Sequence, residues 1–239
     1  MTSAKIKRFY KQAAVAAMTD GGFSVTLDGR SVRTPGGAPL RLPTAALAEA
    51  IAEEWRVQGT HVLPHTMPLM QLAATALDRI PPQREAVIDA LLDFAATDLL
   101  CYRAPEPRDL AERQNRHWQP LLDWAMTQFD APLRVTHGVM PVPQSEEALV
   151  ALRRAIAAHE TWRLTALQSA TVVTGSLILG LALVNGRLDA ETVFVVSQLD
   201  ESHQIELWGE DAEAEERRHH LRHDINAVGR MIYLLSIEG

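Results

Sequence analysis

The sequence predicts an α+β fold, in which a small N-terminal β-containing domain is followed by a larger, mainly α-helical bundle domain. Two observations lead to this prediction. Short segments separated by Asp-Gly and Gly-Gly pairs fill the first forty residues, and apolar residues recur at helical spacing through most of the remainder. We place the domains at residues 1–80 and 81–239, which suits a chain of 239 residues.

Three short strands are expected at residues 13–18, 23–27 and 31–34. Asp-Gly pairs between such segments favour hairpin turns, because these turns require a positive φ that glycine adopts easily. Phe23, Val25 and Leu27 alternate with polar residues, so one face of this sheet should be apolar. A sheet of two hairpins is marginally stable and needs a cover.

A helix over residues 44–58 can supply that cover. Thr44 is the expected N-cap, and Gly59 ends the helix. Leu47, Ile51 and Trp55 form one apolar stripe, which we expect to lie against the sheet.

The remaining elements follow from apolar spacing and from the positions of proline. Proline lacks the amide that a helix interior needs, so we expect one helix to end at Pro81 and another to be broken at Pro120. A short strand is expected at 133–135. The predicted helices cover residues 69–80, 88–102, 108–129, 145–158, 161–185 and 189–208, with a last helix whose apolar residues run from 221 to 235.

An acidic segment over residues 189–216 is the most unusual feature of the sequence. It contains ten carboxylates and no Lys or Arg, whereas the rest of the chain has 23 basic and 20 acidic residues. Glu206, Glu210 and Glu213 are spaced to share one face of a continuous acidic helix. The segment therefore indicates a surface for a basic partner, although a solvated polar face is the simpler alternative.

Trp208 lies at the centre of this segment and is followed by Gly209. We expect it to be partly exposed and to act as an anchor, because aromatic side chains dominate many protein interfaces. The predicted partner-binding residues are Glu206, Trp208, Glu210, Asp211 and Glu213.

No catalytic residue, metal ligand or cofactor-binding residue is predicted. His219 and His223 are one helical turn apart, yet the neighbouring arginines oppose a cation and the zincin motif is absent. Cys101, near Asp98, reads as a buried structural cysteine because no histidine lies nearby in the sequence. The alternative function is a small-molecule hydrolase or metal-dependent enzyme that uses the His219 and His223 helix.

The arginines at 217, 218, 222 and 230 are expected to pair with the preceding carboxylates and not with nucleic acid. A single cysteine suits a reducing compartment, and the first eleven residues lack the apolar run of a secretory signal. The longest apolar run, at 172–184, is too short to span a bilayer, so no membrane insertion is expected.

Seven motifs also occur in a characteristic order along the chain. They are Arg8-Phe9-Tyr10, Leu27-Asp28-Gly29-Arg30 with Thr34-Pro35, Glu54-Trp55, Thr66-Met67-Pro68-Leu69, Asp98-Leu99-Leu100-Cys101-Tyr102-Arg103, Trp118-Gln119-Pro120-Leu121-Leu122 with Trp124, and Trp208-Gly209-Glu210-Asp211 with Glu213. In these motifs the chain resembles the assembly chaperones of the F-type ATP synthase head that bind the α subunit, a family of mitochondria and α-proteobacteria. The resemblance extends over about residues 8 to 235.

This resemblance implies a chaperone that holds the unassembled α subunit until the β subunit replaces it, with no enzymatic activity and no cofactor. It implies a cytoplasmic protein if the chain is bacterial and a mitochondrial matrix protein if it is eukaryotic. We expect a monomer.

Overall fold

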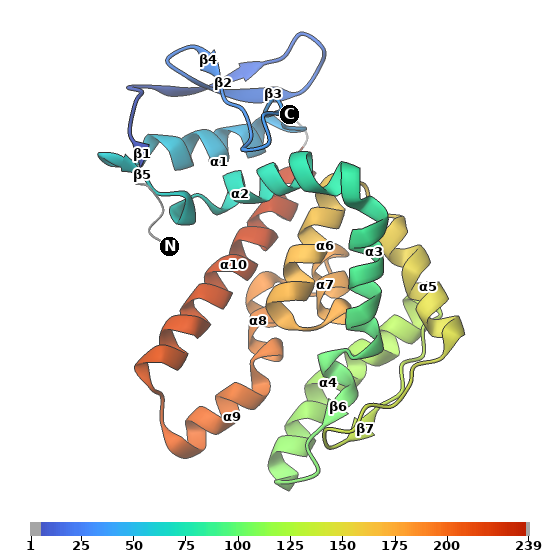
Figure 1. Cartoon of the computed structure of the whole chain (residues 1–239). Helices are drawn as coiled ribbons and strands as arrows, with labels where there is room; N and C mark the ends of the chain where they lie inside the picture. The colour runs from blue at the N-terminus through green and yellow to red at the C-terminus, as the bar shows by residue number, and fades with distance from the viewer. Residues whose placement is uncertain (1–5, 238–239) are drawn as a thin grey trace. The chain divides into compact units, whose positions relative to one another are not determined.

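The computed structural model describes residues 6–237, so the first five residues of the basic N-terminal segment lie outside the described part. It confirms the α+β prediction, with most strands near the N-terminus and helices through most of the rest (Figure 1). The chain divides into two compact units. The first contains residues 1–83 and 230–239, and the second contains residues 84–229.

The first unit contains a three-stranded antiparallel sheet with the order β2-β3-β4 and a small two-stranded antiparallel sheet of β1 and β5. In the larger sheet Val15 of β2 lies opposite Val25 of β3. Asp28 and Gly29 both have positive φ, which confirms the predicted turn between β3 and β4. The strands are β1 (Ile6–Lys7), β2 (Ala13–Ala17), β3 (Phe23–Leu27), β4 (Arg30–Ser31) and β5 (His61–Val62).

Helix α1 (Ala45–Arg56) packs on β2 and β3 and covers the sheet as predicted (Figure 1). The Thr44 hydroxyl accepts a hydrogen bond from the Leu47 amide, which confirms the N-cap. Leu47 and Ile51 are fully buried, whereas Trp55 is only partly buried. The cover of this end of the sheet is therefore less complete than the apolar stripe predicts.

The segment after α1 differs from the prediction, because the chain does not leave the helical conformation at Pro81. Helix α2 (Pro68–Ala74) continues through a π-helical turn (Thr75–Arg79) into α3 (Ile80–Ala96). Pro81 and Pro82 lie directly before a kink, so their missing amides coincide with a local break in the helix. The irregularity lies instead at Gln83, whose backbone has φ −124° and ψ 20°.

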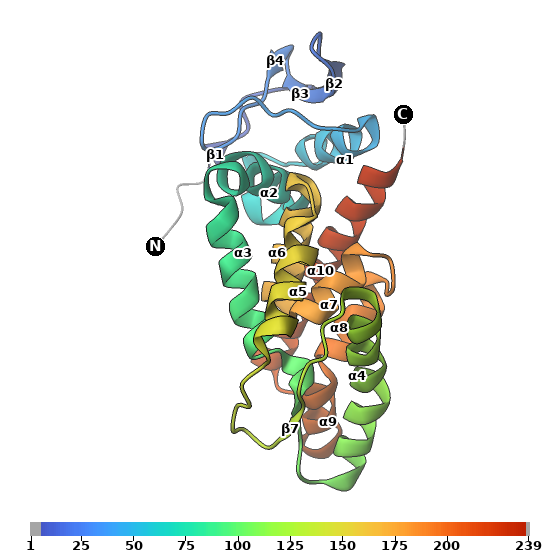
Figure 2. The same cartoon turned by 90° about the vertical axis from the view of Figure 1, so that its right-hand side faces the viewer.

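The second unit is built around α7 (Leu177–Val184), whose eight residues are all buried. Helices α4, α6 and α8 pack against it (Figure 2). The helices of this unit are most of α3, α4 (Arg108–Phe129), α5 (Glu146–Ala157), α6 (Thr161–Thr174), α7, α8 (Ala190–Ser197), α9 (Leu199–Trp208) and most of α10 (Ala212–Ser236). Strands β6 (Tyr102–Arg103) and β7 (Thr136–His137) form a parallel pair.

Five predictions in this unit were wrong. The helix predicted to end at residue 102 ends at Ala96, and Tyr102 belongs to strand β6. The α4 helix is continuous through Pro120, because Pro120 and Arg116, one turn earlier, both lie on the exposed side of the helix. The predicted strand at 133–135 is absent, and the strand lies at Thr136–His137. The predicted helix 161–185 is interrupted at Gly175, which has φ 70°, and the predicted helix 189–208 is interrupted at Gln198.

Candidate protein-binding surface

Helices α9 and α10 meet at a corner that the local sequence determines. Gly209 has φ 84° and ψ 168°, a conformation that is essentially restricted to glycine. The Asp211 carboxylate then accepts a hydrogen bond of 2.8 Å from the Ala214 amide and caps the start of α10. The helix therefore stops at Trp208, and the chain changes direction before it becomes helical again (Figure 1).

Trp208 projects from the end of α9 with 82% of its side chain exposed, which confirms that it is not a core residue. Leu207 beside it is 57% exposed. A large indole in water is a typical anchor for a partner, because its burial on binding removes much apolar area from water.

The prediction that Glu206, Glu210 and Glu213 share one helical face was wrong. The helix ends at Trp208, so Glu206 lies on α9, Glu213 lies on α10, and Glu210 lies in the connection. The structure instead brings these residues and Asp211 to one exposed corner. Gly209, three positions after the last carboxylate of α9, is the sequence signal for this break.

The acidic segment is also less isolated than predicted, because several of its carboxylates pair with arginines. Glu206 forms an ion pair of 2.7 Å with Arg113 of α4, and the Glu210 carboxylate lies 4.0 Å from Arg218. The Arg113 guanidinium lowers the pKa of Glu206. Within residues 6–237, no hydrogen bond or ion pair is seen for the side chains of Glu213, Glu215 and Glu216, which leaves their charge to solvent or to a partner.

The predicted pairing of the arginine strip is confirmed for three of its members. Arg217 pairs with Glu201 at 3.0 Å, Arg222 pairs with Glu191 at 2.5 Å, and Arg218 faces Glu210. These pairs connect α8, α9 and the corner to α10. Because most of the side chains are largely exposed, each pair contributes only about 0 to 1 kcal/mol.

A hollow of about 590 Å³ lies between α9 and α10 next to the corner. Four carboxylates and two potentially basic side chains surround it. It is lined by Glu201, Asp211, Glu213, Ala214, Glu216, Arg217, His220 and Leu221. The excess of carboxylates suits a basic side chain of a partner.

The three histidines of α10 do not form a metal site with their neighbours. His219, His220 and His223 are exposed, and His223 lies 3.6 Å from Asp224. Within residues 6–237 no group of three or more His, Cys, Asp or Glu side chains is placed to hold a metal ion. That this protein binds no metal stays a prediction.

Cys101 and Asp98 are buried residues with structural roles. Burial raises the pKa of the Cys101 thiol to about 12, so the thiol is protonated and unreactive near neutral pH. The Asp98 carboxylate accepts hydrogen bonds from Leu100, Ile178 and the Ser176 hydroxyl, at 2.7 to 3.0 Å. Sequence reasoning did not find this role, because Asp98 and α7 are about eighty residues apart.

His203 is a second residue that sequence reasoning missed. It is 2% exposed on α9, and within the described residues neither ring nitrogen has a hydrogen-bond partner. The nearest carboxylate oxygen, on Asp109 of α4, is 3.9 Å from its Nδ1. His203 lies one turn before Glu206, so it packs under the pair that joins α9 to α4.

None of the helices in the described part of the chain is long and apolar enough to cross a bilayer. The family model of the ATP12 chaperone protein matches residues 7–126. Among solved structures, Atp12 from Paracoccus denitrificans is 44% identical, with 96% of this chain and 98% of that chain covered and a TM-score of 0.89.

Two further relatives extend the comparison. The Atu1473 protein from Agrobacterium tumefaciens is 40% identical, with 96% of this chain and 86% of that chain covered and a TM-score of 0.90. The mitochondrial protein atp12 from Schizosaccharomyces pombe is 26% identical over 222 residues, which are 88% of this chain and 76% of the relative.

Proposed function

Since the chain belongs to the ATP12 chaperone family and is an assembly chaperone of ATP synthase, we propose that its client is the α subunit of the catalytic head. On this proposal it holds the unassembled α subunit until the β subunit takes its place. The corner residues Glu206, Trp208, Glu210, Asp211 and Glu213 are the proposed contact site.

The exposed Trp208 side chain is the observation that best supports this site. A chaperone that covers a subunit interface needs an apolar anchor together with charges that select the correct partner. Trp208 provides the anchor, and the carboxylates around it provide negative charge next to a hollow that can receive a basic side chain. The client surface proposed for this corner is therefore apolar at its centre and basic at its edge.

We further propose that the protein acts without enzymatic activity and without a cofactor, in the cytoplasm if the chain is bacterial and in the mitochondrial matrix if it is eukaryotic. The alternative of a hydrolase or metal-dependent enzyme has no supporting observation at His219 and His223. A chaperone needs neither a nucleophile nor a metal, because its work is to bind and release another protein.

Binding of purified α subunit to a Trp208→Ser variant tests the proposal. We expect affinity to fall about 30-fold, which corresponds to the roughly 2 kcal/mol of an interface hot spot. The matched control is Tyr233→Ser, which removes another exposed aromatic side chain, 66% exposed, from the other end of α10. Wild-type affinity in the Trp208→Ser variant, with an unchanged melting curve, would show that the α9 and α10 corner is not the binding site.

A further inference from the structure

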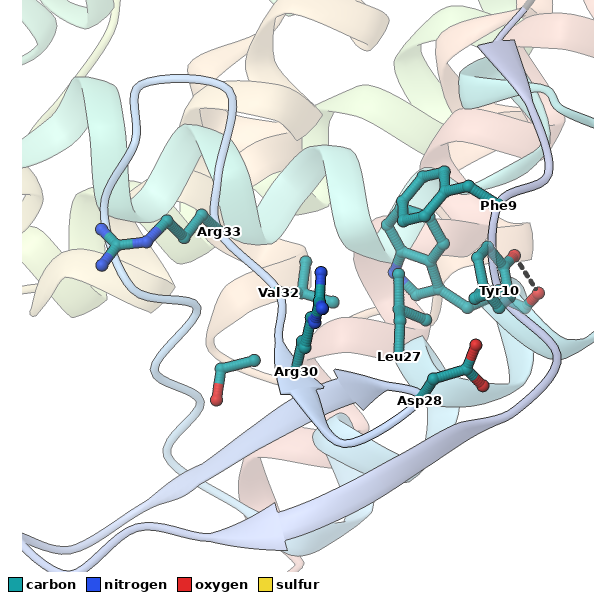
Figure 3. Close-up of a pocket in the computed structure, with 9 residues that line it drawn as sticks. Phe9, Tyr10, Leu27, Asp28, Arg30, Val32 and Arg33 are labelled. Atoms are coloured by element: carbon teal, nitrogen blue, oxygen red, sulfur yellow. Dashed lines mark hydrogen bonds between the residues drawn. The ribbon is translucent and has the colours of Figure 1, made fainter.

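A pocket of about 580 Å³ lies in the first unit, next to the hairpin of β3 and β4 (Figure 3). Leu27 and Val32 provide apolar surface, and Phe9, Tyr10 and Trp55 form an aromatic wall on one side. All of these residues belong to the first unit. The pocket shares no residue with the α9 and α10 corner.

The aromatic wall is held in place by its own contacts. The Tyr10 ring packs edge to face on Trp55, with centroids 5.5 Å apart, and its hydroxyl donates a hydrogen bond of 2.6 Å to the Trp55 carbonyl. Phe9 packs edge to face on Tyr10 at 5.4 Å, yet it is 69% exposed. The wall therefore offers an ordered apolar surface that nothing in the first unit fully covers.

The charge at the pocket is positive, although the chain as a whole has a net charge of −7. Arg30 rises from β4 beside Leu27, and Arg33 lies farther along the same segment (Figure 3). Within residues 6–237 neither guanidinium forms an ion pair, and Arg33 donates one hydrogen bond, to the Gly37 carbonyl. Both cations are therefore available to an anionic partner.

Asp28, the carboxylate that lines the pocket, does not neutralise these arginines. Its oxygens accept hydrogen bonds from the backbone amides of Lys11 and Gln12, at 2.9 to 3.1 Å. These bonds lower the pKa of Asp28 and hold it at the turn. The Asp28 side chain therefore connects the segment before β2 to the hairpin of β3 and β4.

We propose that this pocket binds an acidic peptide segment of a partner protein, with a large apolar side chain against Phe9 and flanking carboxylates on Arg30 and Arg33. Guanidinium groups bind carboxylates through paired hydrogen bonds. A nucleotide fits less well. A base is usually enclosed between two exposed aromatic faces. Tyr10 is only 6% exposed, so Phe9 is the one largely exposed ring of the wall.

The test uses the full chain and a fluorescein-labelled peptide of nine residues, with a central Leu-Phe pair flanked by Glu and Asp. Fluorescence polarisation should show saturable binding that weakens with salt. The Arg30→Glu/Arg33→Glu double variant and the Phe9→Ser variant should each bind at least tenfold more weakly. Arg230→Glu, which alters an exposed arginine of the first unit outside the pocket, should bind like the wild type.

Equal binding by the wild type and the double variant would overturn the proposal, as would an equal loss in Arg230→Glu. Binding of ADP at the pocket without binding of the peptide would also overturn it and would assign the pocket to nucleotides. Because the α-subunit assay depends on Trp208, a failure of the peptide assay alone leaves the proposed function intact. If neither the α-subunit assay nor the peptide assay gives the expected result, each proposal is rejected by its own test.

Discussion

At the scale of single residues, Asp98 has the most demanding surroundings. Its carboxylate is fully buried, and burial raises its pKa to about 6 in spite of the three hydrogen bonds that it accepts. These bonds join the short 3₁₀ turn Leu99–Cys101 to the N-terminus of α7. One side chain thus satisfies amides from two segments that are distant in sequence.

We predict that Asp98 makes stability depend on pH in an unusual direction. The folded state binds the Asp98 proton more tightly than the unfolded chain, so protonation stabilises the fold. This contribution is present below pH 4 and is lost as pH rises through about 6, and the difference amounts to about 3 kcal/mol. Urea unfolding of the wild type and of Asp98→Asn at pH 4.5, 5.5 and 7 measures it.

The comparison uses the change in the free energy of unfolding with pH and not its absolute value, since Asp98→Asn also changes the hydrogen bonds. The wild type should lose stability relative to the variant over this interval. Parallel pH profiles of the two proteins would contradict the raised pKa.

Residues with local roles could be predicted from the sequence. The N-cap at Thr44 and the exposure of Trp208 follow from neighbours within a few positions. Asp98, His203 and the pocket at Phe9 could not be predicted, because their surroundings come from residues many positions away. Glu206, Glu210 and Glu213 were assigned to one helix because spacing alone gives no weight to the conformation of Gly209.

At the scale of elements, a buried glutamate determines where α2 begins. Both carboxylate oxygens of Glu54, on α1, accept hydrogen bonds of 2.8 Å from the amides of Leu69 and Met70. These are two of the amides that the first turn of a helix leaves without an internal partner. The negative charge also suits the positive end of the helix dipole.

We predict that Glu54→Ala lowers the free energy of unfolding by about 2 to 3 kcal/mol, because two buried amides lose their acceptors. Glu54→Gln retains one acceptor oxygen, so its free energy of unfolding should lie between those of Glu54→Ala and the wild type. Denaturant unfolding measures both. The control is Glu53→Ala, the exposed neighbour, for which we expect a change of about 0.5 kcal/mol or less. Equal effects at the two positions would exclude the capping role.

Helices were predicted well where one apolar stripe continues without interruption, as in α1 and α5. Their limits were wrong where proline or glycine has two possible meanings. Proline usually ends a helix, but the chain stays helical through Pro81 as far as the kink at Gln83, and through Pro120 on the exposed side of α4. The distinction depends on which carbonyls can reach solvent, and only the packed structure shows this.

At the scale of the whole molecule, charge is unevenly distributed. Carboxylates gather on one corner of the second unit, whereas the pocket of the first unit has two arginines that form no ion pair with any described residue. Composition predicts the first of these features, because the acidic segment is continuous in sequence. It does not predict the second, because Phe9, Arg30 and Trp55 come together only in the fold.

We predict that the rate of association with the α subunit falls as salt rises, because the corner attracts a basic surface through charge. Glu213→Lys should slow association at low salt and reduce this salt dependence, with little change in the rate of dissociation. Stopped-flow measurements at low and high salt test it. Asp93→Lys changes an exposed carboxylate of α3 by the same charge and should leave both rates unchanged. If the two variants behave identically, the change in association rate is due to the net charge of the protein and not to the corner.

The Thr44 hydroxyl caps α1 and also donates a hydrogen bond of 2.9 Å to the Leu234 carbonyl near the end of α10. The first unit is therefore assembled from both ends of the described chain, with residues 84–229 between them. The sheet and α1 are synthesised early during translation, but the last piece of their unit is made more than 170 residues after α1. The first unit is therefore complete only after the acidic corner of the second unit has been synthesised.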